Sequence, residues 1–240
     1  MGSYLFQTSL RRPRLDQVAK IRARMPADWT YLHFTDQDIL HYFSEHPLPG
    51  FEGIVEQFTS ISAGAHKADL FRYYFLYLNG GVYLDSDVLL TRKIADVVGD
   101  CNFATVLGTL FPGTVFNGFL YCASPRNPLI LDALRHLLAC KPCDLESDYF
   151  YTCSHVYRLV TQNSHGLVLK LFREAWHTDK SLAIVDDDGA TQMVHYWIEK
   201  SVPVTARGYY AVYFLRKEAW SLARHYSKRL HGLLVGRDSD

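Results

Sequence analysis

The stretch from Ala65 to Leu90 reads AHKADLFRYYFLYLNGGVYLDSDVLL. It has no Gly or Pro up to Leu78, and its interior is apolar or aromatic almost all round, which predicts a buried helix. The Asn79-Gly80-Gly81 sequence predicts the end of that helix, because Gly adopts the left-handed conformation at no steric cost. Val82–Leu84 is short, apolar and β-prone, so it predicts a central strand.

Two carboxylates follow this strand, at Asp85 and Asp87. If the strand continues, residues i and i+2 share one face, so both side chains can reach the same divalent cation. Ligands of open α/β sheets bind at this edge, beyond the carboxyl ends of the strands. On the preceding helix, Asp69 and Arg72 lie at i and i+3, on one face. A buried unpaired charge is costly, so we expect them to pair with each other or with a polar ligand.

The whole stretch resembles the glycosyltransferases that share a DXD sugar-binding region, the family of capsular-polysaccharide and yeast α-mannosyl transferases. It is also similar to the glycosylating domains of large clostridial toxins. The resemblance rests on a pattern of the kind A-x-K-x-D-x-x-R-x-x-x-L-x-x-x-G-G-x-Y-x-D-x-D. The matching positions beside Ala65 are Lys67, Asp69, Arg72, Leu76, Gly80, Gly81, Tyr83, Asp85 and Asp87.

Shorter echoes extend the resemblance over most of residues 3–220. Tyr4–Thr8 resembles the family's first strand, residues 29–36 the second strand, and Asn117-Gly118-Phe119 the N-G-F segment. Thr152-Cys153-Ser154 stands where the family often has T-G-P, with the Gly and the Pro replaced.

The late segment H-x-W-x-x-S-W of the family is only partly matched, since Trp220 is kept but the His and the Ser are not. The identity of a third metal ligand is therefore open. His195 and Trp197 are candidates for the missing His and Trp, although a core or surface role is favoured for both.

The resemblance implies an α/β chain with the GT-A fold, a Rossmann-like mixed central sheet flanked by helices. The order of predicted strands and helices supports the α/β class independently. We expect one domain over residues 1–240, in which residues 1–110 form the half that binds nucleotide sugar and metal and residues 111–240 form the acceptor half.

The implied activity is that of a metal-dependent retaining glycosyltransferase, which moves a hexose from a UDP- or GDP-sugar to a glycan, protein or small-molecule hydroxyl. Asp85 and Asp87 would hold Mn²⁺ or Mg²⁺. Asp87 is expected to bind the metal directly, and Asp85 to contact the ribose and sugar hydroxyls, with the metal reached directly or through water. By resemblance, Asp69 and Arg72 bind the hydroxyls of the transferred sugar, and Arg72 also lies near the phosphate.

The remaining donor-binding residues are also taken from the resemblance. Tyr83 would border the ribose, and Asn117 and Trp220 would lie near the donor, although core packing or a turn explains these three residues equally well. The base pocket is expected to be lined by Phe6, Gln7 and Thr8.

Composition bounds the other possibilities. The 25 basic and 25 acidic side chains of the 240 residues balance, which gives no indication of nucleic-acid or anionic-membrane binding. No apolar stretch approaches the roughly 20 residues of a membrane span, and the N-terminus lacks a signal-peptide core. Five cysteines, including a Cys140-x-x-Cys143 pair, predict free thiols. These features predict a cytoplasmic enzyme.

Two alternative functions stay open. A haloacid-dehalogenase-like phosphatase also has D-x-D after an apolar strand, but that motif requires Thr or Val where Leu89 stands, and it normally opens the domain. A catalytically inactive nucleotide-sugar-binding protein would explain the incomplete late motifs. The acidic run at residues 186–188 is expected to form an exposed turn, because Asp and Gly favour turns.

Overall fold

The computed structural model describes residues 3–109, 111–162, 164–178 and 181–196. By internal contacts the chain divides into residues 1–198 and residues 199–240, and every described residue falls in the first unit. Trp197 and Trp220 lie outside the described residues.

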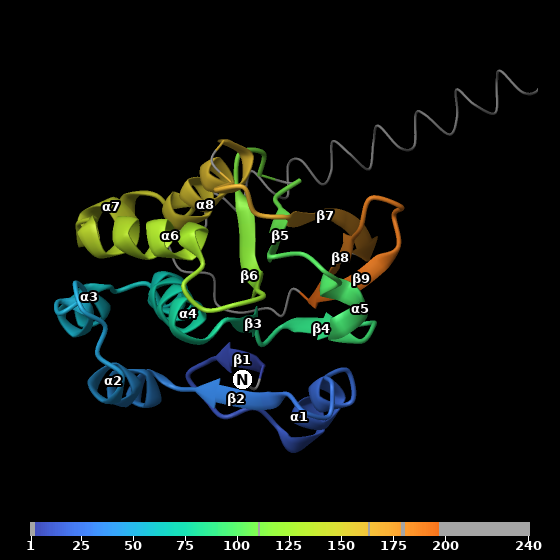
Figure 1. Cartoon of the computed structure of the whole chain (residues 1–240), viewed down its shortest axis with the longest axis horizontal. Coiled ribbons are helices and arrows are strands. Elements are labelled where there is room, and N and C mark those ends of the chain that lie inside the picture. The colour runs from blue at the N-terminus through green and yellow to red at the C-terminus, as the bar shows by residue number, and fades with distance from the viewer. Residues whose placement is uncertain (1–2, 110, 163, 179–180, 197–240) are drawn as a thin grey trace, which may run out of the picture. The chain divides into compact units, whose positions relative to one another are not determined.

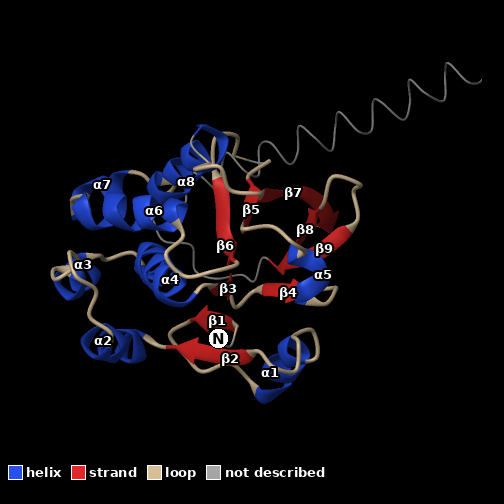
Figure 2. Cartoon of the chain, in the orientation of Figure 1, coloured by secondary structure: helices blue, strands red, loops and turns tan. Residues whose placement is uncertain are grey.

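A mixed sheet organises the described part of the chain (Figures 1 and 2). Its order is β2-β1-β3-β6-β5-β7-β8-β9-β4. Three neighbouring pairs are parallel, β1 with β2, β1 with β3, and β5 with β7, and the other five pairs are antiparallel. The strands are β1 (Tyr4–Thr8), β2 (Thr30–Phe34), β3 (Gly81–Leu84), β4 (Val88–Leu90), β5 (Phe103–Leu107), β6 (Val115–Cys122), β7 (Leu169–Thr178), β8 (Ser181–Val185) and β9 (Thr191–Tyr196).

Helices cover both faces of this sheet. Side chains alternate between the two faces along each strand, so neighbouring residues join different core clusters. In β1 and β3, Phe6 and Tyr83 join one core cluster, which contains residues of α2, α3, α4, α6, α7 and α8, while Leu5 and Val82 join a second cluster with α1 and α5. The helices are α1 (Leu15–Arg22), α2 (Asp36–Glu45), α3 (Ile54–Ser60), α4 (Gly64–Asn79), α5 (Ile94–Val98), α6 (Pro128–Ala139), α7 (Pro142–Ser147) and α8 (Tyr151–Gln162). The predicted α/β chain with a mixed sheet flanked by helices is confirmed.

The helix–glycine–strand unit forms as predicted. α4 ends at Asn79, and Gly80 (φ 68°) and Gly81 (φ 97°) both adopt positive φ. A Cβ on Gly81 would lie 2.5 Å from the carbonyl oxygen of Tyr4, so only Gly lets β3 begin this close to β1. The elements that sequence patterns missed are mostly short or less regularly patterned: β4, α5, α7, β7 and β9.

The turn after β3 connects two strands that lie far apart in the order of the sheet. β3 pairs with β1 and β6, whereas β4 is the last strand and pairs with β9. Only three residues separate Leu84 from Val88, and consecutive Cα atoms are about 3.8 Å apart, so the β4 end of the sheet must fold back close to β3. This return brings the late strand β9 beside the D-x-D sequence.

Two composition-based expectations can be compared with the structure. Among the described residues, no helix is both long and apolar enough to cross a bilayer. All five cysteines, which lie in the described part, are free thiols, as predicted.

Candidate functional site

Two charged side chains of α4 are buried where this helix passes the carboxyl end of β3. Asp69 is 4% exposed and Arg72 is 3% exposed. Nη1 of Arg72 lies 3.4 Å from Oδ1 of Asp69, and Nη2 lies 3.5 Å from Oδ1 of Asp85. The same guanidinium donates to the carbonyl oxygen of Asn117 and lies 4.0 Å from the centre of the Tyr83 ring. Arg72 therefore links the helix to the D-x-D turn.

The charges of this cluster stabilise one another. Burial alone would lower the pKa of Arg72, but Tyr83, Asp69 and Asp85 raise it above its ordinary value. Burial alone would raise the pKa of Asp69, but Arg72 and His66 hold it below its ordinary value. Both groups are therefore ionised at neutral pH, as a buried ion pair requires.

Asp69 also collects hydrogen bonds from outside its own helix. Asn117 Nδ2 on β6 donates to Asp69 Oδ1 at 3.1 Å, and Thr152 Oγ1 on α8 donates to Asp69 Oδ2 at 2.5 Å. His66 Nδ1 lies 3.4 Å from Asp69 Oδ2. Three segments far apart in the sequence thus converge on one carboxylate.

Two buried polar atoms next to Asp69 can each form a further hydrogen bond. Oδ1 of Asn117 and Nε2 of His66 make no hydrogen bond with any residue that the structure describes. Buried polar groups are normally paired, and an unpaired one needs an explanation, of which a missing ligand or water is the usual kind. The surroundings of Asp69 thus retain unused hydrogen-bonding groups.

A second group of contacts fixes the first aspartate of the motif. Tyr83 donates its hydroxyl to Asp85 Oδ1 at 2.6 Å and lies 3.0 Å from Thr8 Oγ1. Gln7 Nε2 donates to the carbonyl oxygen of Asp85 at 3.1 Å, and Tyr31 donates to Gln7 Oε1 at 2.8 Å. Burial raises the pKa of Tyr83 well above its ordinary value, so the phenol stays protonated and able to donate.

The two carboxylates of the motif lie in a turn, not in a continuing strand. β3 ends at Leu84, and the Val88 N–H donates to the Asp85 carbonyl at 3.0 Å. The two-residue strand period that was expected to align Asp85 with Asp87 therefore does not apply, because the chain must turn to reach β4.

His195 of β9 lies opposite Val88 in the ladder between β4 and β9, with Nε2 3.8 Å from Asp87 Oδ1. Its ring stacks on Phe116 at 4.5 Å between ring centroids. One of the two candidates for the missing late histidine and tryptophan is thus placed beside the D-x-D motif.

The donor set suits a hard divalent cation. Carboxylate oxygens are the ligands that Mg²⁺ and Mn²⁺ prefer, and Oδ2 of Asp85 makes no hydrogen bond with a described residue. Within the described ranges, no three His, Cys, Asp or Glu side chains gather as a metal-binding group. Mg²⁺ commonly uses one or two carboxylates and takes its other ligands from water and substrate phosphates, a pattern that two aspartates fit.

The other predicted residues have different placements. Phe6 is fully buried and packs against Phe71, Phe75 and Tyr83, so its side chain belongs to the core. Gln7 is 2% exposed and Thr8 is half-buried. Sequence reasoning gave no role to His66, although its i, i+3 spacing to Asp69 on a predicted helix was a usable signal. It noted Thr152 only within an incomplete motif.

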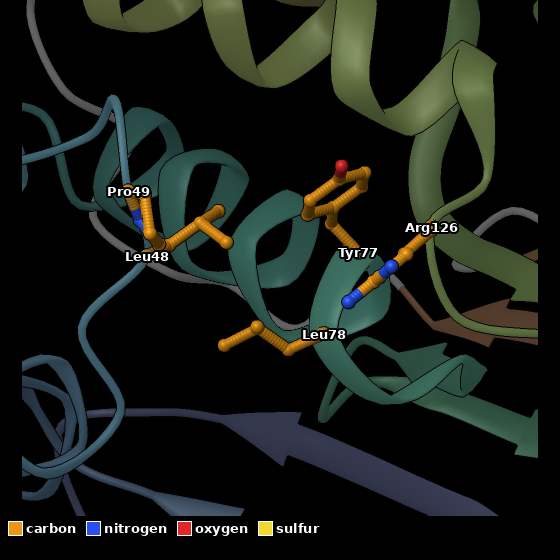
Figure 3. Close-up of a pocket in the computed structure, with 5 residues that line it drawn as sticks. All are labelled: Leu48, Pro49, Tyr77, Leu78 and Arg126. Atoms are coloured by element: carbon orange, nitrogen blue, oxygen red, sulfur yellow. The ribbon is translucent and has the colours of Figure 1, made fainter.

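A separate pocket of about 320 Å³ lies at the other end of α4 (Figure 3). Tyr77 and Leu78 of the last helical turn form part of its wall, and Arg126 reaches toward them. Because a helix rises about 1.5 Å per residue, this end of α4 lies on the order of 12 Å along the helix from Asp69. None of the predicted site residues lines this pocket, whose remaining lining residues are Leu48 and Pro49.

Comparison with known proteins adds structural likenesses. A solved structure titled PaToxG glycosyltransferase matches with a TM-score of 0.43 and 12% identity, over 65% of this chain and 66% of that one. The glycosyltransferase GlyE of Streptococcus pneumoniae TIGR4 matches with a TM-score of 0.39 and 13% identity, over 71% of this chain and 45% of that one.

Comparison of sequences adds a relative and a family model. Inositol phosphoceramide mannosyltransferase 1 of Schizosaccharomyces pombe is 26% identical over 109 residues, which is 45% of this chain and 32% of the relative, so the chain spans about a third of that protein's length. Residues 14–104 match the model of the glycosyltransferase sugar-binding region containing the DXD motif. The predicted resemblance is thus confirmed, because residues 14–104 match the model of the region that the DXD-containing glycosyltransferases share.

Proposed function

We propose that this protein is a metal-dependent retaining glycosyltransferase that moves a hexose from a UDP- or GDP-sugar to a hydroxyl acceptor. The observation that carries the proposal is the chain Asp69–Arg72–Asp85, in which a buried ion pair of a helix is coupled to the partly exposed D-x-D turn. A fold has little reason to bury such charges for stability, because a buried ion pair is often no better than apolar packing. Binding a polar ligand supplies the reason.

Asp85 and Asp87 would hold Mn²⁺ or Mg²⁺ at this turn, with Asp87 as the direct ligand and Asp85 also facing the ribose and sugar hydroxyls. When bound, the cation supplies Lewis-acid stabilisation of the charge on a departing nucleoside diphosphate. Tyr83 keeps Asp85 in place through its 2.6 Å hydrogen bond, and Gln7 holds the backbone of the same residue.

The residues around Asp69 would bind the transferred sugar. Asp69 accepts hydrogen bonds from sugar hydroxyls, and Oδ1 of Asn117, which has no partner among the described residues, provides a further acceptor. Arg72 stays protonated and places a positive charge between the sugar and the phosphate, where it opposes the negative charge that develops on the leaving group.

The transfer itself needs little from a base. The bond between the anomeric carbon and the leaving phosphate oxygen breaks, a bond from the acceptor oxygen to the anomeric carbon forms, and the acceptor proton passes to the leaving phosphate. Because the pKa of Asp69 is below its ordinary value, this carboxylate is a poor general base. That property supports transfer with retention, in which the leaving phosphate accepts the proton.

The two halves of the chain would divide the substrates, with residues 1–110 binding the donor and residues 111–240 the acceptor. The division would not be complete, since Asn117 and Thr152 of the second half reach Asp69 and so complete the donor-sugar site. A glycan, a protein side chain or a small molecule could supply the hydroxyl. The name of the Schizosaccharomyces pombe relative makes a mannosyl donor the first one to test.

The test is a thermal-shift screen of UDP- and GDP-sugars with and without Mn²⁺. A ligand at 100 times its Kd adds about 2.7 kcal/mol to the stability. For a chain of this size that corresponds to a rise of about 5–10 °C in Tm. We expect such a rise for one nucleotide sugar, in the presence of the metal. Equal shifts with and without metal, or no shift with any donor, would contradict the proposal.

A further inference from the structure

A short basic segment between β1 and the end of α1 departs from the charge balance of the chain. Residues 10–24 contain six basic side chains and one acidic side chain, whereas the whole chain has 25 of each. All six are exposed, and they are Arg11, Arg12, Arg14, Lys20, Arg22 and Arg24. Four of them, Arg11, Lys20, Arg22 and Arg24, make no ion pair with another described residue.

The same segment carries two leucines that are not buried. Leu10 is 84% exposed and Leu15 is 88% exposed, more than any other large apolar side chain that the structure describes. Leu15 and Arg22 lie at i and i+7 on α1, so they share one face of the helix, while Ile21 faces the core. A leucine and a cation therefore project from the same surface.

Leu10 lies in a loop that is held by several hydrogen bonds. The Ser9 N–H donates to the Phe34 carbonyl at 3.2 Å, and Ser9 Oγ donates to the Arg11 carbonyl at 2.6 Å. Arg12 donates to the His33 carbonyl and to Asp38 Oδ1, both at 2.8 Å. Because Ser9 and Arg12 are both hydrogen-bonded to β2, the loop that carries Leu10 is held in place with this side chain in solvent.

We propose that residues 10–24 form a docking surface for an anionic phospholipid bilayer. Clustered Arg and Lys side chains are attracted to anionic headgroups, and exposed leucines gain free energy by entering the acyl boundary. Nucleic acid would satisfy the cations but offers no apolar interior for Leu10 and Leu15. The bilayer is the partner that uses both kinds of side chain.

The surface lies next to the candidate site. Leu10 is two residues beyond Thr8, whose Oγ1 is 3.0 Å from the Tyr83 hydroxyl that binds Asp85. α1 lies beside β2, the strand at one end of the sheet order (Figure 1). Docking through this segment would hold the D-x-D turn near the headgroups, which favours an acceptor hydroxyl presented at a membrane surface. This last consequence rests on the proposed function, whereas the docking does not.

The experiment is co-sedimentation of the full chain with vesicles of phosphatidylcholine alone or with about 30% phosphatidylserine. We expect binding to the anionic vesicles only, weakened as salt rises through the screening range. Leu10→Ser with Leu15→Ser should lower the partition coefficient at least about tenfold, since each leucine loses its apolar burial. Arg11→Gln with Arg22→Gln should lower it at least about tenfold as well, at about fivefold per charge.

Matched controls come from exposed residues elsewhere. Val168 is 61% exposed on the approach to β7, and Arg135 is exposed on α6. Val168→Ser and Arg135→Gln should leave binding unchanged, and all variants should keep the Tm of the parent. No binding to anionic vesicles, equal binding to neutral ones, or binding that the leucine variant retains would overturn the proposal. So would loss of nucleotide-sugar shifts in the leucine variant with vesicle binding intact, because the segment would then serve the donor site.

Discussion

Helices α4 and α6 pack in the same core, but α4 buries polar side chains whereas α6 leaves them at least partly exposed. α6 is amphipathic: Leu129, Ile130, Ala133, Leu134 and Leu137 face the core, and Arg135 faces solvent. α4 buries nine of its sixteen residues without regard to polarity, His66, Asp69 and Arg72 among them. Since burying charge costs free energy, the contrast supports the proposal that α4 serves a ligand, whereas packing alone explains α6.

The largest expected effect comes from breaking the buried ion pair. Arg72→Met removes the partner of both Asp69 and Asp85, and leaving a buried charge uncompensated costs about 3–5 kcal/mol. Arg12→Met breaks the exposed Arg12–Asp38 pair, which should contribute no more than about 1 kcal/mol. Urea unfolding of both variants measures the difference, and equal losses would show that the α4 pair is no more essential than a surface pair.

The second prediction tests whether Asp87 of the D-x-D turn takes part in the reaction. Asp87→Ala should lower turnover of the donor at least about 10²-fold, the scale for losing a preorganised electrostatic stabiliser. The exposed Asp188→Ala in the 186–189 turn removes a carboxylate without a proposed role and serves as control. Donor turnover is followed by release of the nucleoside diphosphate. Near-parental turnover in Asp87→Ala would remove the metal role from this residue.

The third prediction uses two threonines of α8. Thr152→Val deletes the 2.5 Å hydrogen bond to the buried Asp69 carboxylate and should cost about 1.5–3 kcal/mol of unfolding free energy. Thr161→Val deletes a 2.7 Å bond to the Tyr157 carbonyl on the exposed side and should stay within about 0.5 kcal/mol. If the two variants lost the same stability in urea unfolding, α8 would have no special link to the α4 cluster.

The smallest expected effect is a dependence of stability on pH that comes from two histidines, one on α6 and one on α8. His136 and His155 stack at 3.7 Å between ring centroids, and burial, with His136 and Arg158 nearby, lowers the pKa of His155 to about 4 from its ordinary 6.5. The unfolded chain therefore takes up the proton first, so stability is full above pH 6.5 and falls between pH 6.5 and about 4.

Because His155 is only partly buried, solvent screening should leave about 1 kcal/mol of this effect, and the resulting Tm loss of about 2–4 °C should be reduced in His155→Gln but not in His41→Gln, whose side chain is exposed. An unchanged pH profile in His155→Gln would assign the acid sensitivity elsewhere.

The α4–β3 unit could be read from sequence because its signals are local. A run without Gly or Pro, a double glycine and an apolar triplet fix the helix, its end and the strand within a few residues of one another, and the structure agrees to within a residue at each end. The pairing of Asp69 with Arg72 was expected from their i, i+3 spacing, whereas a shared site with Tyr83, Asp85 and Asn117 was expected only by resemblance, since nothing local brings Asn117 to α4.

Other features depended on contacts that local pattern does not encode. β4 is three residues long, and only its pairing with β9 makes it a strand. Phe6 was expected near a base, yet its position opposite Phe71 and Phe75 places it in the core. The expectation that Asp85 and Asp87 share a strand face failed because the chain must turn at Ser86 to reach the far end of the sheet.

By itself the sequence determined the helix, the glycine stop, the buried strand and the two carboxylates beyond it, because each follows from the steric and hydrophobic preferences of neighbouring residues. The tertiary structure alone decided that Thr152 holds Asp69, that His195 stands beside Asp87, and that Leu10 and Leu15 remain in solvent. These outcomes depend on how a folded-back sheet brings distant strands and helices together, and such closure is a property of the whole packed chain.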